Sequence, residues 1–83
     1  MFKNNKQDTK NLIKQIFNEV SRLNDDIFKL DVFIRTKQFE KNLSEEEKQY
    51  IDECGHQLSG MKQYKQALEN RTVLLEHSLE SMK

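Results

Sequence analysis

Apolar residues recur through the first half of the chain in alternating steps of three and four residues. The members of this repeat are Ile13, Ile16, Val20, Leu23, Ile27, Leu30 and Ile34. A β-strand requires alternation of apolar and polar residues, whereas a seven-residue repeat places one stripe along an α-helix. The first half therefore predicts a long amphipathic helix whose stripe needs a second helix to cover it.

A second apolar stripe follows a break, and its members are Ile51, Cys54, Leu58, Met61, Leu68, Leu75 and Leu79. In the break, Ser44 precedes three glutamates, Glu45–Glu47. This is the pattern of a capping box, and acids in a first turn suit the positive end of the helix dipole. We therefore expect a helix to begin at Ser44. A cation site at the three glutamates is the less common alternative. Phe39 and Leu43 are expected to close the end of the hairpin.

Length and composition favour a single all-α domain over residues 1–83. The 83 residues include no proline and two glycines, and 34% of them are charged, a profile typical of long helices. Residues 1–44 carry nine basic and six acidic side chains (+3), and residues 45–83 carry five and eight (−3). Opposite charges favour antiparallel packing of the two halves. The sequence predicts a long antiparallel two-helix hairpin, with helices at about 7–38 and 45–80 and a turn at 39–44.

Apolar residues outside the stripes predict that the hairpins assemble. Phe17 and Phe28 are eleven residues apart, about three helical turns, and therefore share a second face. One partner helix cannot cover both this face and the main stripe. We therefore expect a compact homo-oligomer.

The charge balance and the single cysteine exclude several classes of function. A net charge of zero disfavours binding to DNA or RNA, which normally requires a basic excess. One cysteine cannot form an internal disulfide, and no apolar run is long enough for a membrane span. A soluble cytosolic protein is expected. The basic segment Lys3–Lys14 is a weak membrane-surface signal because Asp8 interrupts it.

The only cysteine, Cys54, lies two residues before His56, a pairing that raises the question of a reactive centre. Side chains two residues apart on a helix point about 200° apart, so the pair cannot share a metal or a proton. Cys54 is interpreted as a buried apolar residue, and His56 as a solvated residue or one at a subunit boundary. Gly55 and Gly60 allow a close approach of a neighbouring backbone or a ligand, mark a bend, or are merely tolerated. No phosphate-binding glycine loop or serine elbow is present, so we expect neither an enzyme nor a cofactor or metal site.

Residues 30–71 resemble a family of small phage proteins. The segment reads LDVFIRTKQFEKNLSEEEKQYIDECGHQLSGMKQYKQALENR, with the spacing L-x-x-F-I, F-x-x-x-L-S and Q-L-x-x-M-x-x-Y-x-x-x-L-x-x-R. This pattern is similar to that of the anti-CBASS cyclic-nucleotide sponges, whose helical hairpin also occurs in one class of anti-Thoeris sponge. The matching positions are Leu30, Phe33, Ile34, Phe39, Leu43, Ser44, Gln57, Leu58, Met61, Tyr64, Leu68 and Arg71.

The resemblance implies a homohexamer that acts in the cytoplasm of the infected bacterial host. Such proteins bind cyclic di- and trinucleotide second messengers between protomers and hold them without cleavage, which blocks CBASS-type defence. On this basis Lys29 and Arg71 are candidate phosphate ligands, with Thr72 as a hydroxyl or backbone contact.

The family usually has a tyrosine near the start of the first helix that stacks on a base, and this chain has none. Phe17, with Lys14 one turn earlier, is the candidate replacement, and an interface role for Phe17 is the alternative. Tyr64 is interpreted as a packing residue whose hydroxyl finds a neighbour. The alternative function is a coiled-coil structural or adaptor protein that binds another protein through its apolar helix faces.

Overall fold

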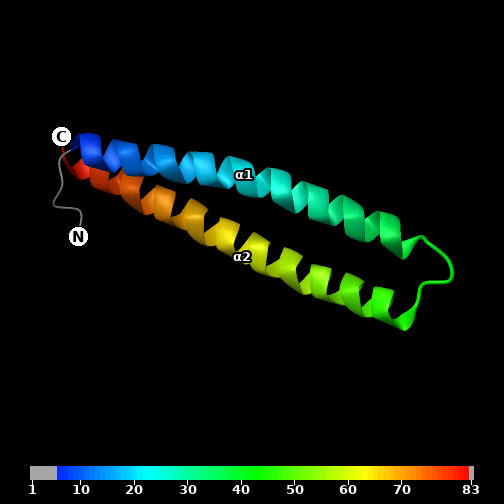
Figure 1. The fold of residues 1–83 in the computed structure, drawn as a ribbon. Coiled ribbons are helices and arrows are strands. Elements are labelled where there is room, and N and C mark those ends of the chain that lie inside the picture. Colours follow the sequence, from blue (N-terminus) through cyan, green and yellow to red (C-terminus); the bar gives the residue numbers. More distant parts are fainter. Residues whose placement is uncertain (1–5, 83) are drawn as a thin grey trace.

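The computed structural model describes residues 6–82 and consists of two helices, α1 (Lys6–Gln38) and α2 (Glu45–Ser81). The helices run antiparallel, with the described ends of the chain at one end of the rod and the turn at the other (Figure 1). The predicted all-α hairpin is therefore confirmed. Residues 3–5 of the basic segment Lys3–Lys14 lie outside the described residues.

The turn contains a left-handed residue and ends in a complete capping box. Asn42 has φ 64°, a conformation that asparagine tolerates better than most side chains. The Ser44 hydroxyl accepts from the Glu47 amide at 3.1 Å, and the Glu47 carboxylate accepts from the Ser44 amide at 3.1 Å. These bonds satisfy amides that would otherwise have no partner at the start of α2. The predicted helix start at Ser44 is confirmed.

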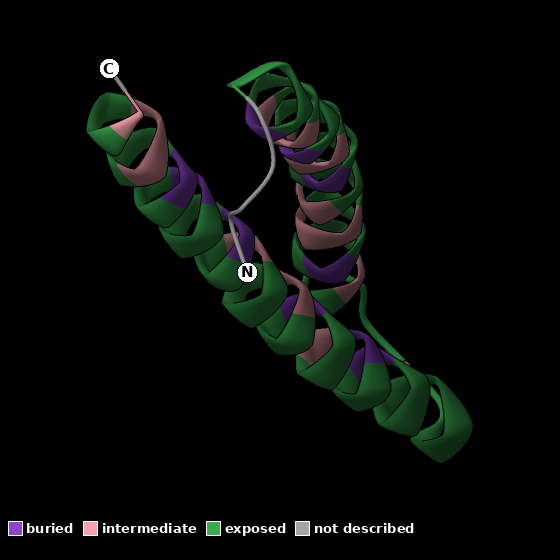
Figure 2. Cartoon of the chain, turned by 90° about the vertical axis from the view of Figure 1, so that its left-hand side faces the viewer, coloured by how far each residue is buried: buried purple, intermediate pink, exposed green. Residues whose placement is uncertain are grey.

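Two small apolar clusters hold the helices together. The buried members of the first are Ile16, Leu23, Leu68 and Leu75, and those of the second, nearer the turn, are Ile34, Ile51, Cys54 and Leu58. Figure 2 shows the buried positions on the sides of the helices that face each other. The stripe of α2 also continues through half-buried Lys65 and buried Thr72, which fill the seven-residue spacing between the apolar members.

The expectation that Phe39 closes the hairpin is wrong. Leu43 packs against the cluster near the turn, but Phe39 is 87% exposed. Phe39 comes five residues after Ile34, whereas the stripe proceeds in steps of three and four. Even a continued helix would place its side chain about 140° away from Ile34. Leu43 alone of this pair reaches the core.

The hairpin leaves much more surface in contact with solvent than a compact domain of its size does. The molecule measures 61 × 17 × 13 Å, and its radius of gyration is 18.3 Å, against about 12 Å for a compact chain of this length. Its accessible surface is 6632 Å², whereas a folded monomer of this mass exposes about 5,200 Å². The exposed large apolar residues include Phe17, Phe28 and Val32 on α1 and Val73 and Leu74 on α2.

Leu68 is the completely buried side chain of the seam, and we expect its truncation to destabilise the hairpin. Leu68 is 0% exposed, so Leu68→Ala should lower the free energy of unfolding by about 2–5 kcal/mol. Leu74→Ala removes the same atoms from a side chain that is 59% exposed and serves as the matched control. Urea unfolding followed by circular dichroism measures both losses. A loss for Leu68→Ala no larger than that for Leu74→Ala would contradict the assigned core.

The capping box should give the fold a measurable dependence on pH. The Ser44 amide, and after it the Ser44 hydroxyl, lower the pKa of Glu47 below its ordinary value of 4.5. A carboxylate with a lowered folded-state pKa stabilises the fold above its unfolded-state pKa, and this contribution disappears as pH falls through the folded-state pKa. At pH 7, Glu47→Gln should therefore melt at a lower temperature than the original chain. The difference should shrink between roughly pH 5 and pH 3.

The matched control for this pH dependence is Glu46→Gln, because Glu46 is an exposed acid of the same helical turn. Thermal melting at several pH values compares the two variants with the original chain. A melting difference for Glu47→Gln that stays constant from neutral pH to pH 3 would show that the ionised carboxylate contributes nothing to the cap.

Candidate functional site

One flank of α2 carries polar and aromatic side chains at intervals of seven residues. We call Tyr50, Gln57, Tyr64 and Arg71 the Tyr64 flank. Seven residues are nearly two helical turns, so these side chains form one row. The Tyr50 ring contacts Phe33 of α1, Gln57 lines a groove together with residues of α1, and the Tyr64 hydroxyl bonds to Glu19 of α1.

Tyr64 is connected to α1 by a hydrogen bond. Its hydroxyl donates to the Glu19 carboxylate, which confirms that the hydroxyl finds a neighbour. The residue is 48% exposed, however, so Tyr64 is not a packing residue of the seam. This bond raises the pKa of Tyr64, and the positive charge of Arg71 partly opposes the increase. Arg71 is therefore close enough to act electrostatically on the Tyr64 hydroxyl. This hydrogen bond fixes the axial register of α1 relative to α2 midway along the hairpin.

A groove lies beside Gln57 on the same side of the hairpin. Its volume is about 320 Å³, and it is lined by Asp26, Lys29, Leu30 and Phe33 of α1 and by Gln57 and Met61 of α2. Leu30 and Met61 are half-buried, whereas Asp26, Lys29 and Gln57 are exposed. We call this hollow the Lys29 groove. It combines an apolar floor with a cation, an anion and an amide at its rim.

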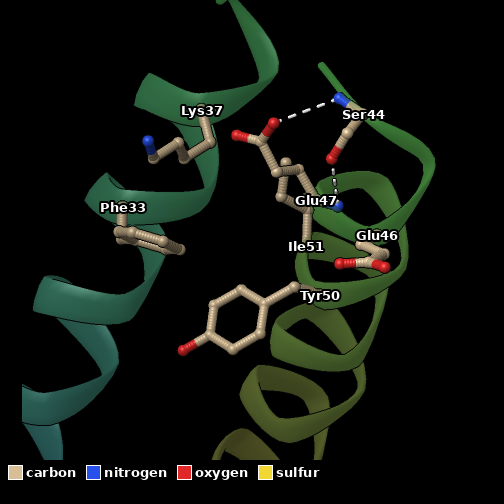
Figure 3. A pocket seen from close by; sticks show the side chains of 7 residues that line it. All are labelled: Phe33, Lys37, Ser44, Glu46, Glu47, Tyr50 and Ile51. Atoms are coloured by element: carbon tan, nitrogen blue, oxygen red, sulfur yellow. Dashed lines mark hydrogen bonds between the residues drawn. The ribbon is translucent and has the colours of Figure 1, made fainter.

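A second hollow, of about 300 Å³, lies at the turn and is drawn in Figure 3. The rings of Phe33 and Tyr50 meet edge to face there, with centroids 6.1 Å apart. The Lys37 ammonium lies 6.0 Å from the centre of the Phe33 ring and pairs with Glu40 at 3.2 Å. Glu46 and Glu47 also line this hollow, so an anionic ligand would meet two carboxylates. The arrangement is suited to closing the hairpin end rather than to holding phosphate.

The two candidate phosphate ligands lie far apart in one chain. Lys29 is ten residues from Glu19 toward the turn, and Arg71 is seven residues from Tyr64 toward the chain ends. At 1.5 Å per residue they are therefore separated by about 25 Å along the rod. Both side chains are exposed. Within one protomer, Lys29 and Arg71 therefore do not line the same pocket.

Of the three remaining candidate ligand residues, Thr72 is buried between the helices, whereas Lys14 and Phe17 lie on the surface of the hairpin. Thr72 is 9% exposed, and its hydroxyl donates to the Leu68 carbonyl at 3.1 Å. Lys14 is exposed and Phe17 is 59% exposed. Phe17 lies two residues before Glu19, about 200° around α1, and so points away from the Tyr64 flank. The roles of all five residues remain predictions.

Lys29 and Arg71 differ from several other cations in having no carboxylate partner within residues 6–82. Arg35 pairs with Asp31 at 3.1 Å, and Lys48 pairs with Glu45 at 3.4 Å. Neither Lys29 nor Arg71 forms an ion pair in this part of the chain. A ligand phosphate could therefore bind either one without first displacing a carboxylate.

The Cys54 and His56 side chains lie apart, the first in the seam and the second on the surface. Cys54 is 6% exposed in the seam, as predicted. The His56 side chain is 78% exposed, and its Nδ1 lies 3.6 Å from Glu53. Within residues 6–82 no group of three histidine, cysteine or acidic side chains could hold a metal ion, and neither helix has a stretch apolar enough to cross a membrane.

Gly55 and Gly60 have room for a side chain within the hairpin. A Cβ placed at either position would meet no atom within 4 Å. Close packing between α1 and α2 is therefore not the reason for these glycines. A close approach by another part of the same hairpin is therefore excluded at both glycines. Approach by a ligand or by another copy of the chain, and simple tolerance, are still open.

Comparison with known proteins identifies the family. The family model described as Sequestin matches residues 10–74, a segment that contains both apolar clusters except Leu75, the Tyr64 flank and the Lys29 groove. No curated protein and no solved structure gave a match. The family's name, which denotes sequestration, matches the phage sponges that the sequence resembles. Because the match covers well over half of its residues, the chain belongs to the Sequestin family.

Proposed function

We propose that this protein binds cyclic oligonucleotide second messengers and holds them without cleaving them. The observation that carries the proposal is the Sequestin match over residues 10–74. A phage protein with this activity would act in the cytoplasm of the infected bacterium, where it would deprive a CBASS-type effector of its activating signal. Cyclic di- and trinucleotides are the proposed ligands, and no cofactor is required.

The surface of the hairpin supports assembly into a homo-oligomer, which we propose to be a hexamer. Phe17, Phe28 and Val32 are 59%, 69% and 44% exposed, and 28 and 32 are one turn apart on α1. Large apolar side chains grouped on a helix face are favoured in contacts between protein chains. Further copies of the chain would cover Phe28 and Val32, and the crevices between copies, with Phe17 at their edge, would form the binding pockets.

Lys29 and Arg71 are the proposed phosphate contacts. Both are exposed and form no ion pair within residues 6–82, and a cyclic oligonucleotide brings at least two phosphate charges that need cations. Because the two residues are about 25 Å apart in one chain, each would serve a separate pocket or meet the other across protomers. Tyr64 and Glu19 would hold the surface between them in a fixed register.

Thr72, Lys14 and Phe17 are proposed to complete the sites. The Thr72 hydroxyl already donates to Leu68, so Thr72 would act mainly by fixing the turn of α2 that presents Arg71. Phe17 would offer a flat ring for base stacking, with Lys14 one turn earlier on α1. An exposed ring is available for this role without a change in the hairpin.

An adaptor protein is the second candidate function. The same exposed residues, Phe17, Phe28 and Val32, would suit a helix of a different protein. This alternative predicts a dimer in solution and no change in melting temperature when cyclic nucleotides are added, because the ligand would have no site on the folded state.

Sequestration predicts that bound ligand is recovered unchanged. The purified protein is mixed with a cyclic dinucleotide or a cyclic trinucleotide, freed of unbound ligand by gel filtration and then heated. We expect the protein fraction to carry the nucleotide and to release it intact, as seen by chromatography and mass spectrometry. Linear products would indicate an enzyme, and an absence of nucleotide in the protein fraction would favour the adaptor.

Removal of the Arg71 charge should weaken binding without changing assembly. A hydrogen bond to a charged group contributes about 1.5–3 kcal/mol, so Arg71→Ala should raise the Kd for at least one class of cyclic nucleotide by about 10- to 100-fold. Native mass spectrometry should show the same oligomer as for the original chain. The control is Arg35→Ala, which removes an exposed arginine already paired with Asp31. Equal affinities for the two variants would remove Arg71 from the site.

A further inference from the structure

The Lys29 groove has a size that suits part of a nucleotide better than a whole cyclic ligand. Its volume of about 320 Å³ is at the lower end of the range for small-molecule sites, which is about 300–1,000 Å³. The groove is open along one side of the hairpin, so the remainder of a ligand can extend beyond its rim. All six lining residues lie within the family match.

The floor of the groove is suited to a flat base. Leu30 and Met61 are half-buried, and Phe33 is 37% exposed. An aromatic ring and a polarisable thioether both make favourable contacts with planar rings. Phe33 is also held in place by its edge-to-face contact with Tyr50. The base would therefore rest on side chains whose positions are already fixed.

The rim supplies three different hydrogen-bonding groups. Lys29 only donates, the Asp26 carboxylate only accepts, and the Gln57 amide does both. Asp26 and Lys29 are three residues apart and therefore neighbours on α1. Within residues 6–82 neither forms an ion pair. Both charges are free for a ligand, which can offer a phosphate to Lys29 and N–H groups to Asp26.

The presence of Asp26 restricts which base the groove can accept. A carboxylate beside a nucleotide repels the phosphates, and hydrogen bonds accepted by both of its oxygens offset this cost best. Guanine has two adjacent donors, N1–H and the N2 amino group, on its Watson–Crick edge. Adenine presents only its N6 amino group beside an acceptor nitrogen that would face the carboxylate. Gln57, across the groove, can donate to the guanine O6 oxygen.

We infer that the Lys29 groove receives a guanine base of a cyclic nucleotide, with Asp26 selecting the base and Lys29 contacting the adjacent phosphate. This inference rests on the proposed function and adds a base preference to it. Asp26 is the specificity-determining residue. Its carboxylate makes guanine the favoured base and acts against bases that lack two adjacent donors.

The test uses the full-length protein, with cyclic di-GMP and cyclic di-AMP as probes in titration calorimetry. The original chain should bind cyclic di-GMP at least tenfold more tightly, since one bidentate contact discriminates between bases by about that factor. Asp26→Asn should lower the affinity for cyclic di-GMP at least tenfold. It should also raise the affinity for cyclic di-AMP, because an asparagine amide pairs with adenine in a bidentate manner.

The matched control is Asp25→Asn, which removes the same charge from an adjacent exposed position that does not line the groove. The control should keep the original preference. Equal binding of both probes by the original chain would overturn the inference, and so would an equal loss of both probes in Asp26→Asn. Either result would leave the proposed function in place. Failure of the original chain to bind any cyclic di- or trinucleotide would instead overturn the proposed function itself.

Discussion

The contact between α1 and α2 along one apolar seam is the interaction on which the rest of the hairpin depends. Eight apolar side chains in two clusters form its buried core, and the two helices have no third element to support them within residues 6–82. A pair of helices in contact along one line buries little surface for its length, so most of each helix faces outward. This geometry makes the flanks of the seam, rather than any enclosed interior, the place where chemistry can occur.

The sequence predicts the fold well because the fold depends on periodicity. The unbroken repeat from Ile13 to Ile34 and the cap at Ser44 each have a local physical cause, and both predictions are confirmed. The prediction for Phe39 is wrong because this residue lies five positions after Ile34, outside the steps of three and four, and is therefore exposed despite its apolar character. Thr72 is buried because position 72 lies four residues after Leu68 on the same stripe. Since threonine is polar, the apolar pattern of the sequence does not reveal this burial.

The candidate site is less predictable from the sequence, because it depends on the axial register of the two helices, that is, on which residues of α1 lie opposite which residues of α2. Lys29 and Arg71 could be chosen from the resemblance, yet their separation of about 25 Å follows only once Glu19 is placed opposite Tyr64. Asp26 and Gln57 become neighbours of Lys29 for the same reason. The seven-residue spacing of Tyr50, Gln57, Tyr64 and Arg71 was a signal in the sequence that could have revealed one flank. Nothing in the sequence alone pairs that flank with its partners on α1.

The antiparallel arrangement also places the first residue of α1 and the last residue of α2 at the same end of a body 61 Å long. Lys29 is 23 residues from Lys6, and so about 35 Å from that end. A fluorescent dye or a purification handle attached there would sit remote from the Lys29 groove. The hairpin thus offers a natural point for immobilisation on a sensor surface, with the Lys29 groove held outward.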